Sequence, residues 1–353
     1  MKLDRDTLKL SVIIPIYNNG TMLLNKAFAS LRRCSMFEDM EILFIDDCST
    51  DVDTLAMESY LARHYGNIKL YRFEEECSGS ASRPRNKGVE LATAPYLVFL
   101  DPDDSACEDG YRYLYEEITE TDCDICVGNV YCQKKDVTRF NYFEKVKKYC
   151  SLISFEHGLK KYLPALSFMT VRIHAMMIKS SFIKNFSEKQ IDGAIGQDSL
   201  FSMQMLSSDV FVRFINNYVQ IYYANVENSV TNTVNGTFFE KLLILQPHKI
   251  NWLKENNLLA SFMNNKFKSY TLDYIFVKLV SARVDSACSS EKAVYEILRM
   301  YMEYYDGRCQ IINDFIGRCQ SGKHNEIRYM LQDYYRKKST QNKTPEKEIP
   351  AEV

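Results

Sequence analysis

Residues Tyr96–Asp104 read YLVFLDPDD. The apolar run 97–100 is suited to a buried strand, and three carboxylates follow it at once, those of Asp101, Asp103 and Asp104. Carboxylates this close repel one another, so something positive must usually compensate them. A buried strand that ends in acidic residues therefore predicts a polar site at one edge of a sheet.

The first third of the chain alternates between short apolar runs and helical periodicity. Strands are predicted at Lys9–Ile14, Glu41–Asp46, Ile68–Phe73 and Tyr96–Leu100, with helices at Met22–Arg33, within 48–66 and at Ser82–Ala92. Strands and helices in this rhythm predict an α/β fold, with a Rossmann-like, mostly parallel sheet covered by helices on both faces. Such sheets bind ligands at the carboxyl ends of their strands.

The remainder of the chain is less regular. Two late strands are predicted at Asp209–Ile215 and Val219–Ala224, and apolar residues then step by three and four to about Tyr335. We therefore expect a nucleotide-binding and catalytic domain over 1–235, a helical accessory region over 236–337 and a disordered tail over 338–353.

Bulk properties exclude several classes of protein. The 353 residues carry a net charge of −2, which gives no support to nucleic-acid binding. The N-terminus lacks the features of a signal peptide and no apolar run is long enough to span a membrane, so a cytosolic protein is expected. The end of the helical region, YYRKK at Tyr334–Lys338, leaves the inner face of the membrane as an alternative location. The eleven cysteines, an odd number, are expected to be buried thiols.

Polar residues follow each of the first strands. Pro15, Tyr17 and Asn18 follow the first strand, and Asp46 and Asp47 follow the second. Because parallel strands end at one edge of a sheet, these residues should lie together with the acidic group after the fourth strand.

The acid pair Asp101-Pro-Asp103 suits a hard cation, Mg²⁺ or Mn²⁺. Mg²⁺ typically takes one or two protein carboxylates and completes its shell with water and substrate phosphates, so the pair fits a metal–diphosphate site. The alternative is a capping loop, in which residues 103–105 cap a helix that starts near Glu108.

A basic segment, SGSASRPRNKG at Ser78–Gly88, lies upstream and offers Arg83, Arg85 and Lys87. Arginine suits phosphate because its fork donates two parallel hydrogen bonds. The segment lacks the spacing of a P-loop, and no G-x-G-x-x-G follows the first strand, which disfavours a classical dinucleotide enzyme.

Four segments together resemble the family 2 glycosyltransferases with the GT-A fold, and more loosely the bacterial members that build or decorate surface polysaccharides or teichoic acids. The segments are SVIIPIYNN, EILFIDDCSTD, RPRNKGVELATAPYLVFLDPDD and GAIGQDSLF, which span roughly residues 9–230. The resemblance implies an inverting, metal-dependent transfer of a sugar from a nucleotide-sugar, usually a UDP-sugar. The acceptor would be a hydroxyl of a glycan, a teichoic-acid-like polyol-phosphate polymer or a lipid-linked molecule.

The resemblance also implies roles for individual residues. The nucleotide would be bound by Pro15, Tyr17 and Asn18 at the base and ribose, Asp47 at the uracil edge, Asp101 near the ribose, and Arg85 at the nucleotide or its phosphates. Asp103 would hold the metal, Mn²⁺ or Mg²⁺. Asp198 would be the catalytic base, although an aspartate at a helix start is also an ordinary N-cap.

The chain departs from the family pattern in three places. Gln197 stands where the family often has Glu before the base, and Pro84 stands where it often has Ala. The late loop YYANVENSVTNTV lacks the basic residue that many relatives use near the diphosphate, and Arg172 or His174 could substitute for it.

Two other functions compete with sugar transfer. A sugar nucleotidyltransferase also uses acid pairs and Mg²⁺, but it normally needs a basic, glycine-rich loop where this chain has PIYNNGTML. A catalytically dead nucleotide-binding module is disfavoured by the presence of both Asp103 and Asp198. The C-terminal helices could bind the acceptor or form a homo-oligomer.

Overall fold

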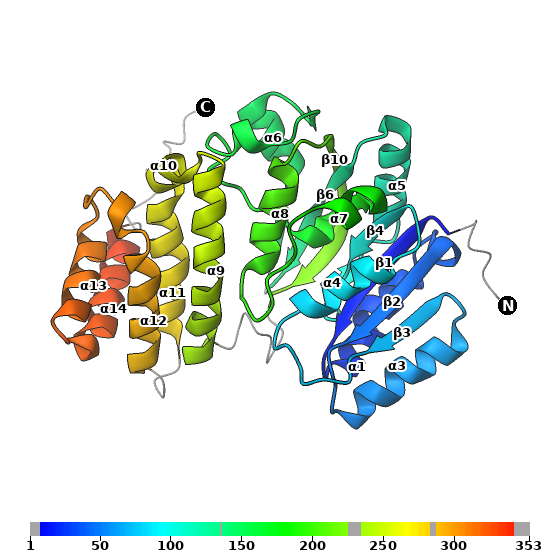
Figure 1. Ribbon diagram of the computed structural model, residues 1–353, viewed down its shortest axis with the longest axis horizontal. Coiled ribbons are helices and arrows are strands. Elements are labelled where there is room, and N and C mark those ends of the chain that lie inside the picture. Colours follow the sequence, from blue (N-terminus) through cyan, green and yellow to red (C-terminus); the bar gives the residue numbers. More distant parts are fainter. Residues whose placement is uncertain (1–7, 135, 225–233, 283–286, 342–353) are drawn as a thin grey trace, which may run out of the picture. The chain divides into compact units, whose positions relative to one another are not determined.

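The computed structural model describes residues 8–134, 136–224, 234–282 and 287–341. The chain divides into two compact units, Met1–Asn228 and Ser229–Val353. The first unit is built on a sheet and the second on helices (Figure 1).

The first unit contains one mixed sheet with the order β3-β2-β1-β4-β9-β6-β10-β5, while β7 pairs with β6 and β8 pairs with β10. Its strands are β1 (Leu10–Ile16), β2 (Met40–Asp46), β3 (Ile68–Arg72), β4 (Tyr96–Phe99), β5 (Ser105–Ala106), β6 (Ile125–Gln133), β7 (Val137–Phe140), β8 (Ser154–Phe155), β9 (Met176–Lys179) and β10 (Val212–Tyr223). The four strands predicted in the first third are confirmed.

Strands β1 to β4 pair with one another in parallel. The chain proceeds from β1 outward to β2 and β3, and then returns to place β4 on the other side of β1. This reversal makes a topological switch point between β1 and β4, where open α/β sheets bind ligands. Beyond β4 the sheet is mixed, because β9 is antiparallel to both β4 and β6.

Helices connect the strands of this unit: α1 (Gly20–Met22), η2 (Leu23–Phe28), α2 (Ala29–Leu31), η3 (Phe37–Asp39), α3 (Val52–His64), α4 (Ser82–Leu91), α5 (Gly110–Thr121), α6 (Tyr142–Cys150), η4 (Lys160–Tyr162), η5 (Ile173–Ala175), α7 (Ser180–Asn185) and α8 (Gln197–Ser207). Asp51 caps α3 by accepting a hydrogen bond from the Thr54 N–H at 2.9 Å. Helix α4 packs closely on β1, since a Cβ on Gly88 would lie 2.3 Å from the Ile13 side chain. This contact fixes the height of α4 above the sheet.

One strand replaces the two that were predicted near residues 209–224. β10 runs without a break from Val212 to Tyr223, parallel to β6, and its register shifts between Phe214 and Gln220. The polar pair Asn216-Asn217 therefore marks an irregularity within a strand rather than a turn, and the prediction of two strands is wrong.

The second unit consists of α9 (Gly236–Glu255), α10 (Leu259–Phe262), η6 (Met263–Phe267), η7 (Tyr270–Ile275), α11 (Phe276–Ser281), α12 (Ala287–Arg299), η9 (Met302–Tyr304), α13 (Gln310–Gln320) and α14 (His324–Gln341). Helix α14 includes residues 338–341 of the segment expected to be a tail, and 342–353 lie outside the described residues. Within the described residues, no helix is long and apolar enough to cross a membrane.

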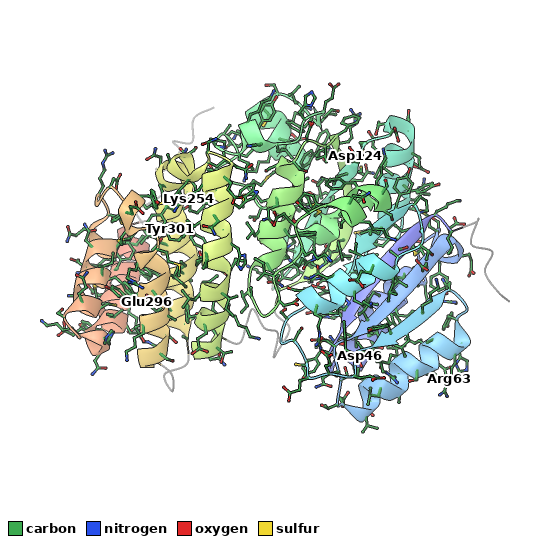
Figure 2. All side chains as sticks on the ribbon, viewed as in Figure 1. Asp46, Arg63, Asp124, Lys254, Glu296 and Tyr301 are labelled. Atoms are coloured by element: carbon green, nitrogen blue, oxygen red, sulfur yellow. The ribbon has the colours of Figure 1, made fainter. Side chains whose placement is uncertain are left out.

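A polar group lies in the core of this helical unit. Tyr301, at the centre of the unit (Figure 2), has no exposed surface and donates a hydrogen bond to Gln246 Oε1 at 2.9 Å. Lys249, one helical turn along α9, is 8% exposed and has its ammonium over the rings of Tyr270 and Phe262. Burial, and to a smaller extent the charge of Lys266, lower the pKa of Lys249 to about 7.

Candidate active site

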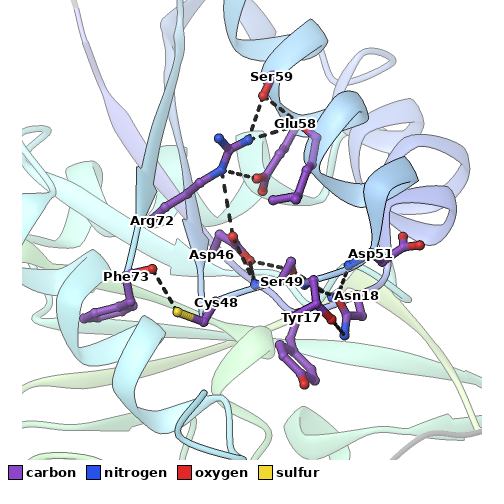
Figure 3. Close-up of polar contacts among 12 residues, drawn as sticks. Tyr17, Asn18, Asp46, Cys48, Ser49, Asp51, Glu58, Ser59, Arg72 and Phe73 are labelled. Carbon is purple, nitrogen blue, oxygen red and sulfur yellow. Dashed lines mark hydrogen bonds and ion pairs between the residues drawn. The ribbon is translucent and has the colours of Figure 1, made fainter. Parts of the chain in front are cut away.

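The loops after β1 and β2 are joined by Asn18 (Figure 3). Its side-chain oxygen accepts hydrogen bonds from the backbone N–H groups of Thr50 and Asp51 at 2.8 and 2.9 Å. Asn18 adopts a left-handed conformation, with φ of 50°, which asparagine tolerates better than most residues. Its neighbour Tyr17 is left 45% exposed at the sheet edge.

The two aspartates after β2 have different partners. Asp46, at the end of β2 (Figure 2), accepts hydrogen bonds from the N–H and hydroxyl of Ser49, and Arg72 lies 3.9 Å away (Figure 3). It therefore holds the loop. Asp47 turns the other way and is 3% exposed. Its carboxylate accepts from the N–H and hydroxyl of Ser78 and pairs with Arg83 at 2.6 Å.

Asp101 belongs to a buried ion network. Its Oδ1 lies 2.5 Å from Arg85 Nη2 and its Oδ2 lies 3.0 Å from His174 Nε2. Arg85 also donates to Gln190 Oε1 at 3.3 Å. Burial alone would raise the pKa of Asp101, but Arg85 and His174 outweigh it and hold that pKa well below its usual range. The protein itself thus supplies the partners that compensate the first carboxylate, and Arg85 carries the positive charge.

This network changes the interpretation of two basic residues. Arg85 is 4% exposed and occupied by Asp101, so a nucleotide could reach its guanidinium only by sharing that ion pair. His174 is 2% exposed, and its Nδ1 has no hydrogen-bond partner among the described residues. Arg85 Nε likewise has no hydrogen-bond partner among the described residues, but both of these nitrogens are buried away from the surface.

Asp103 and Asp104 follow, and neither forms an ion pair with a described residue. Asp104 is 1% exposed and accepts from Gln220 Nε2 at 2.7 Å and from the Tyr223 N–H at 3.1 Å. Burial, Asp101 and Asp103 together raise the pKa of Asp104 well above its usual value. Burial and the charge of Asp101 also raise the pKa of Asp103, which is half-buried. Asp104 has these hydrogen bonds, so Asp103 is the carboxylate of this group with neither an ion pair nor a hydrogen bond from another described residue.

The donor set fits a cation held jointly with a ligand. In the described parts of the chain, no cluster of three or more His, Cys, Asp or Glu side chains is arranged to hold a metal ion. One uncompensated carboxylate beside a ligand diphosphate is nevertheless what Mg²⁺ often uses. The alternative role as a helix cap is wrong, because Ser105–Ala106 is strand β5 and α5 starts at Gly110 without a side-chain cap.

Asp198 lies in the first turn of α8. The N-cap of this helix is Gly196, with φ of 83°, so the interpretation of Asp198 as the N-cap is wrong. The carboxylate of Asp198 is half-buried and accepts no hydrogen bond from any described residue.

Hydrogen bonds tie the segment before Asp198 to α4. Ser82 donates to the carbonyl of Ile191 at 2.8 Å, and the Asn86 side chain bonds both the carbonyl and the N–H of Gln190. The Gly193 N–H donates to the hydroxyl of Ser80, two residues before α4, at 3.1 Å. The helix that carries Arg85 thus also anchors the segment that leads to Asp198.

Residues 11–186, about half of the chain, match the family model described as Glycosyl transferase family 2. The chain belongs to glycosyl transferase family 2. The matched range includes every candidate site residue of this family member except Asp198.

Individual relatives agree with this assignment. The chain is 26% identical over 141 residues to glycosyltransferase GlyG of Streptococcus pneumoniae, covering 40% of this chain and 45% of GlyG. It is 34% identical over 121 residues to the poly(ribitol-phosphate) beta-N-acetylglucosaminyltransferase TarP of Staphylococcus aureus, covering 34% and 36%. The chain thus spans less than half of the length of these curated relatives.

The fold extends further than the sequence similarity. The crystal structure of S. aureus TarS 1–349 in complex with UDP-GlcNAc matches with a TM-score of 0.66, covering 93% of this chain and 92% of that one. The sequence identity is 16%, so the match shows a shared fold, which confirms the predicted GT-A class.

The candidate site residues were identified from the sequence, but the side chains that contact them were not predicted. Asp47, Asp101, Asp103 and the loop after β1 do lie at one edge of the sheet, but Ser78, Gln190 and the contact between His174 and Asp101 were not predicted. No local pattern marks these partners. The loop that lacks a basic residue lies, from 225 to 233, outside the described residues.

Proposed function

We propose that this protein is an inverting, metal-dependent glycosyltransferase that moves a sugar from a UDP-sugar to an acceptor hydroxyl. The observation that carries this proposal is the unpartnered Asp198 carboxylate, anchored through residues 190–193 to the helix that positions Arg85 and Asp101. Membership of glycosyl transferase family 2 supports it.

The chain's own residues account for the chemistry on the acceptor side. The acceptor oxygen attacks the anomeric carbon as the bond from that carbon to the diphosphate oxygen breaks, and the hydroxyl proton passes to Asp198. A positioned carboxylate base typically contributes about 10² to 10⁴-fold in rate. Attack from the face opposite the leaving group inverts the anomeric configuration.

On the donor side, Asp103 would hold Mg²⁺ or Mn²⁺ together with the diphosphate. A bound cation would stabilise the negative charge that develops on the departing diphosphate. Pro15, Tyr17, Asn18 and Asp47 would border the base and ribose.

Relatives suggest the first substrates to test. TarP is named as an enzyme that acts on poly(ribitol-phosphate), and the TarS crystal structure is a complex with UDP-GlcNAc. We therefore propose UDP-sugars, UDP-GlcNAc first, as donors, and a polyol-phosphate polymer, another glycan or a lipid-linked molecule as acceptor. We further propose that the second unit binds the acceptor or mediates self-association, at the inner face of the membrane when the acceptor is lipid-linked.

The test combines UDP binding with donor turnover. Asp198→Asn should bind UDP as the wild type does and lose about 10² to 10⁴-fold in turnover. Asp103→Asn should lose metal-dependent UDP binding. The matched control is Asp209→Asn. The side chain of Asp209 is 85% exposed, and its ion-pair partner is His157, which lies outside the candidate site. Full turnover by Asp198→Asn would refute the role of the base, and nucleotide binding without turnover of any donor by the wild type would favour a binding module.

A further inference from the structure

Arg172 is held in place by aromatic rings. Its guanidinium lies 3.5 Å from the ring centre of Tyr222 and 5.6 Å from that of Phe140. Its backbone N–H donates to the hydroxyl of Tyr142 at 3.4 Å. Stacking uses the flat face of a guanidinium and leaves the N–H donors at its edge available.

Those donors have no partner in the described parts of the chain. The guanidinium of Arg172 makes no hydrogen bond and no ion pair with any described residue, whereas Arg85 is paired with Asp101 and Arg83 with Asp47. A half-buried arginine that is positioned but unpaired is unusual, because a charge removed from water normally acquires a partner.

Arg172 also lies near the acidic group, because the Tyr223 N–H, next to the ring on which Arg172 stacks, donates to Asp104 at 3.1 Å. Burial opposes the charge of Arg172, but Tyr222, Tyr142, Asp198 and Asp104 outweigh burial and raise the pKa of the guanidinium. The charge of Asp198 likewise raises the pKa of Tyr142, after the larger effect of burial. These effects place Arg172, Tyr142 and Asp198 within electrostatic range of one another.

We propose that Arg172 binds a phosphate group of a ligand in the active site. The inference rests on the proposed function, in which the donor brings a diphosphate and a polyol-phosphate acceptor would bring a second phosphate. A guanidinium edge matches two phosphate oxygens, and the aromatic stack fixes its direction before the ligand arrives. His174 cannot take this role, because it is buried against Asp101 and Arg85.

Calorimetric binding of four probes to the full chain, with MgCl₂ or MnCl₂ present, tests the proposal. The probes are UDP, uridine, inorganic pyrophosphate and glycerol 3-phosphate. Arg172→Gln should bind a phosphate probe about tenfold to a hundredfold more weakly, the usual effect of losing a charged hydrogen bond, and should bind uridine unchanged. Arg172→Lys, which keeps the charge but not the fork, should lose less and guards against misfolding of the first variant.

Arg139→Gln is the matched control. Arg139 also lies over two rings, 5.9 Å from both Tyr131 and Tyr218, and is exposed. In β7 it pairs with Tyr131 while Phe140 pairs with Val130, so Arg139 and Phe140 point to opposite faces of the sheet. This variant should bind every probe as the wild type does.

The outcomes distinguish a donor diphosphate from an acceptor phosphate, and they test the role of Arg172 separately from the UDP-sugar donor. Weaker UDP and pyrophosphate binding in the Arg172 variants identifies the donor diphosphate, and weaker glycerol 3-phosphate binding alone identifies the acceptor. Arg172-dependent binding of pyrophosphate without any binding of UDP would keep this inference and refute the UDP-sugar donor. If both Arg172 variants bind all phosphate probes like the wild type, or if the wild type binds none of them, the inference is wrong.

Discussion

Lys249 offers a quantitative test of the helical unit. Its ammonium lies 3.8 Å from the ring centre of Tyr270 and 4.5 Å from that of Phe262, and the nearest charge acting on it is the like charge of Lys266. A buried ammonium without a carboxylate destabilises the folded state whenever it is protonated. Lys249→Met keeps a long, flexible side chain and removes the charge, so we expect a more stable protein.

The magnitude follows from the pKa of Lys249, which is about 7 in the folded protein and 10.5 in its ordinary state. Above pH 10.5 the lysine is neutral in both states and costs nothing. As the pH falls toward 7, only the unfolded chain takes up the proton, so stability is progressively lost, and below pH 7 the full cost remains. Allowing about 1–2 kcal/mol returned by the two rings when the lysine is protonated, the variant should gain about 3–4 kcal/mol at pH 6 and about 2 kcal/mol at pH 9.

Urea unfolding at pH 6, 7.5 and 9 measures this difference. The chain has one tryptophan, Trp252, which is 8% exposed within α9, so its fluorescence reports on the helical unit. Lys268→Met, at an exposed lysine of the same unit, is the control and should change stability little. A Lys249→Met variant that gains nothing, or gains equally at all three pH values, would refute this reasoning.

Three further predictions concern the first unit. Arg85→Met should cost about 3 kcal/mol in urea unfolding at pH 7, because it leaves the Asp101 carboxylate, which is only 25% exposed, without its arginine partner. Since the pKa of Asp101 is lowered in the folded state, its stabilisation exists above its ordinary pKa of 3.8 and disappears as the pH falls below it; the variant should therefore lose less stability than the wild type in acid unfolding. Gly88→Ala should cost about 1–3 kcal/mol in urea unfolding, since the new methyl group would meet Ile13 at 2.3 Å. Gly193→Ala is the comparison: a methyl group there would meet no atom within 4 Å, so any loss of stability would come from the backbone φ of 69°. Asn18→Ala should cost about 1–2 kcal/mol and loosen the loops that it joins, which hydrogen exchange of their backbone would detect; unchanged exchange would show that other contacts hold them.

The local elements were predictable because their signals are local. β1, β2 and β4 are each buried along nearly all of their length, and unbroken apolar runs announce such strands. Turns were harder to predict from the sequence. The pair Asn216-Asn217 belongs to an irregular strand, because pairing with β6 outweighs the local preference of asparagine for turns.

For the active site, the sequence by itself determined which chemistry stands at the sheet edge. Acidic and polar residues that follow β1, β2 and β4 must meet there once those strands pair in parallel. Only the tertiary structure decided which of them remain available. Asp101 is paired with Arg85 and contacts His174, whereas Asp103, Asp198 and Arg172 are left without an ion-pair partner among the described residues. Charge compensation depends on distances between segments far apart in the chain, and those distances are fixed by packing rather than by residue spacing.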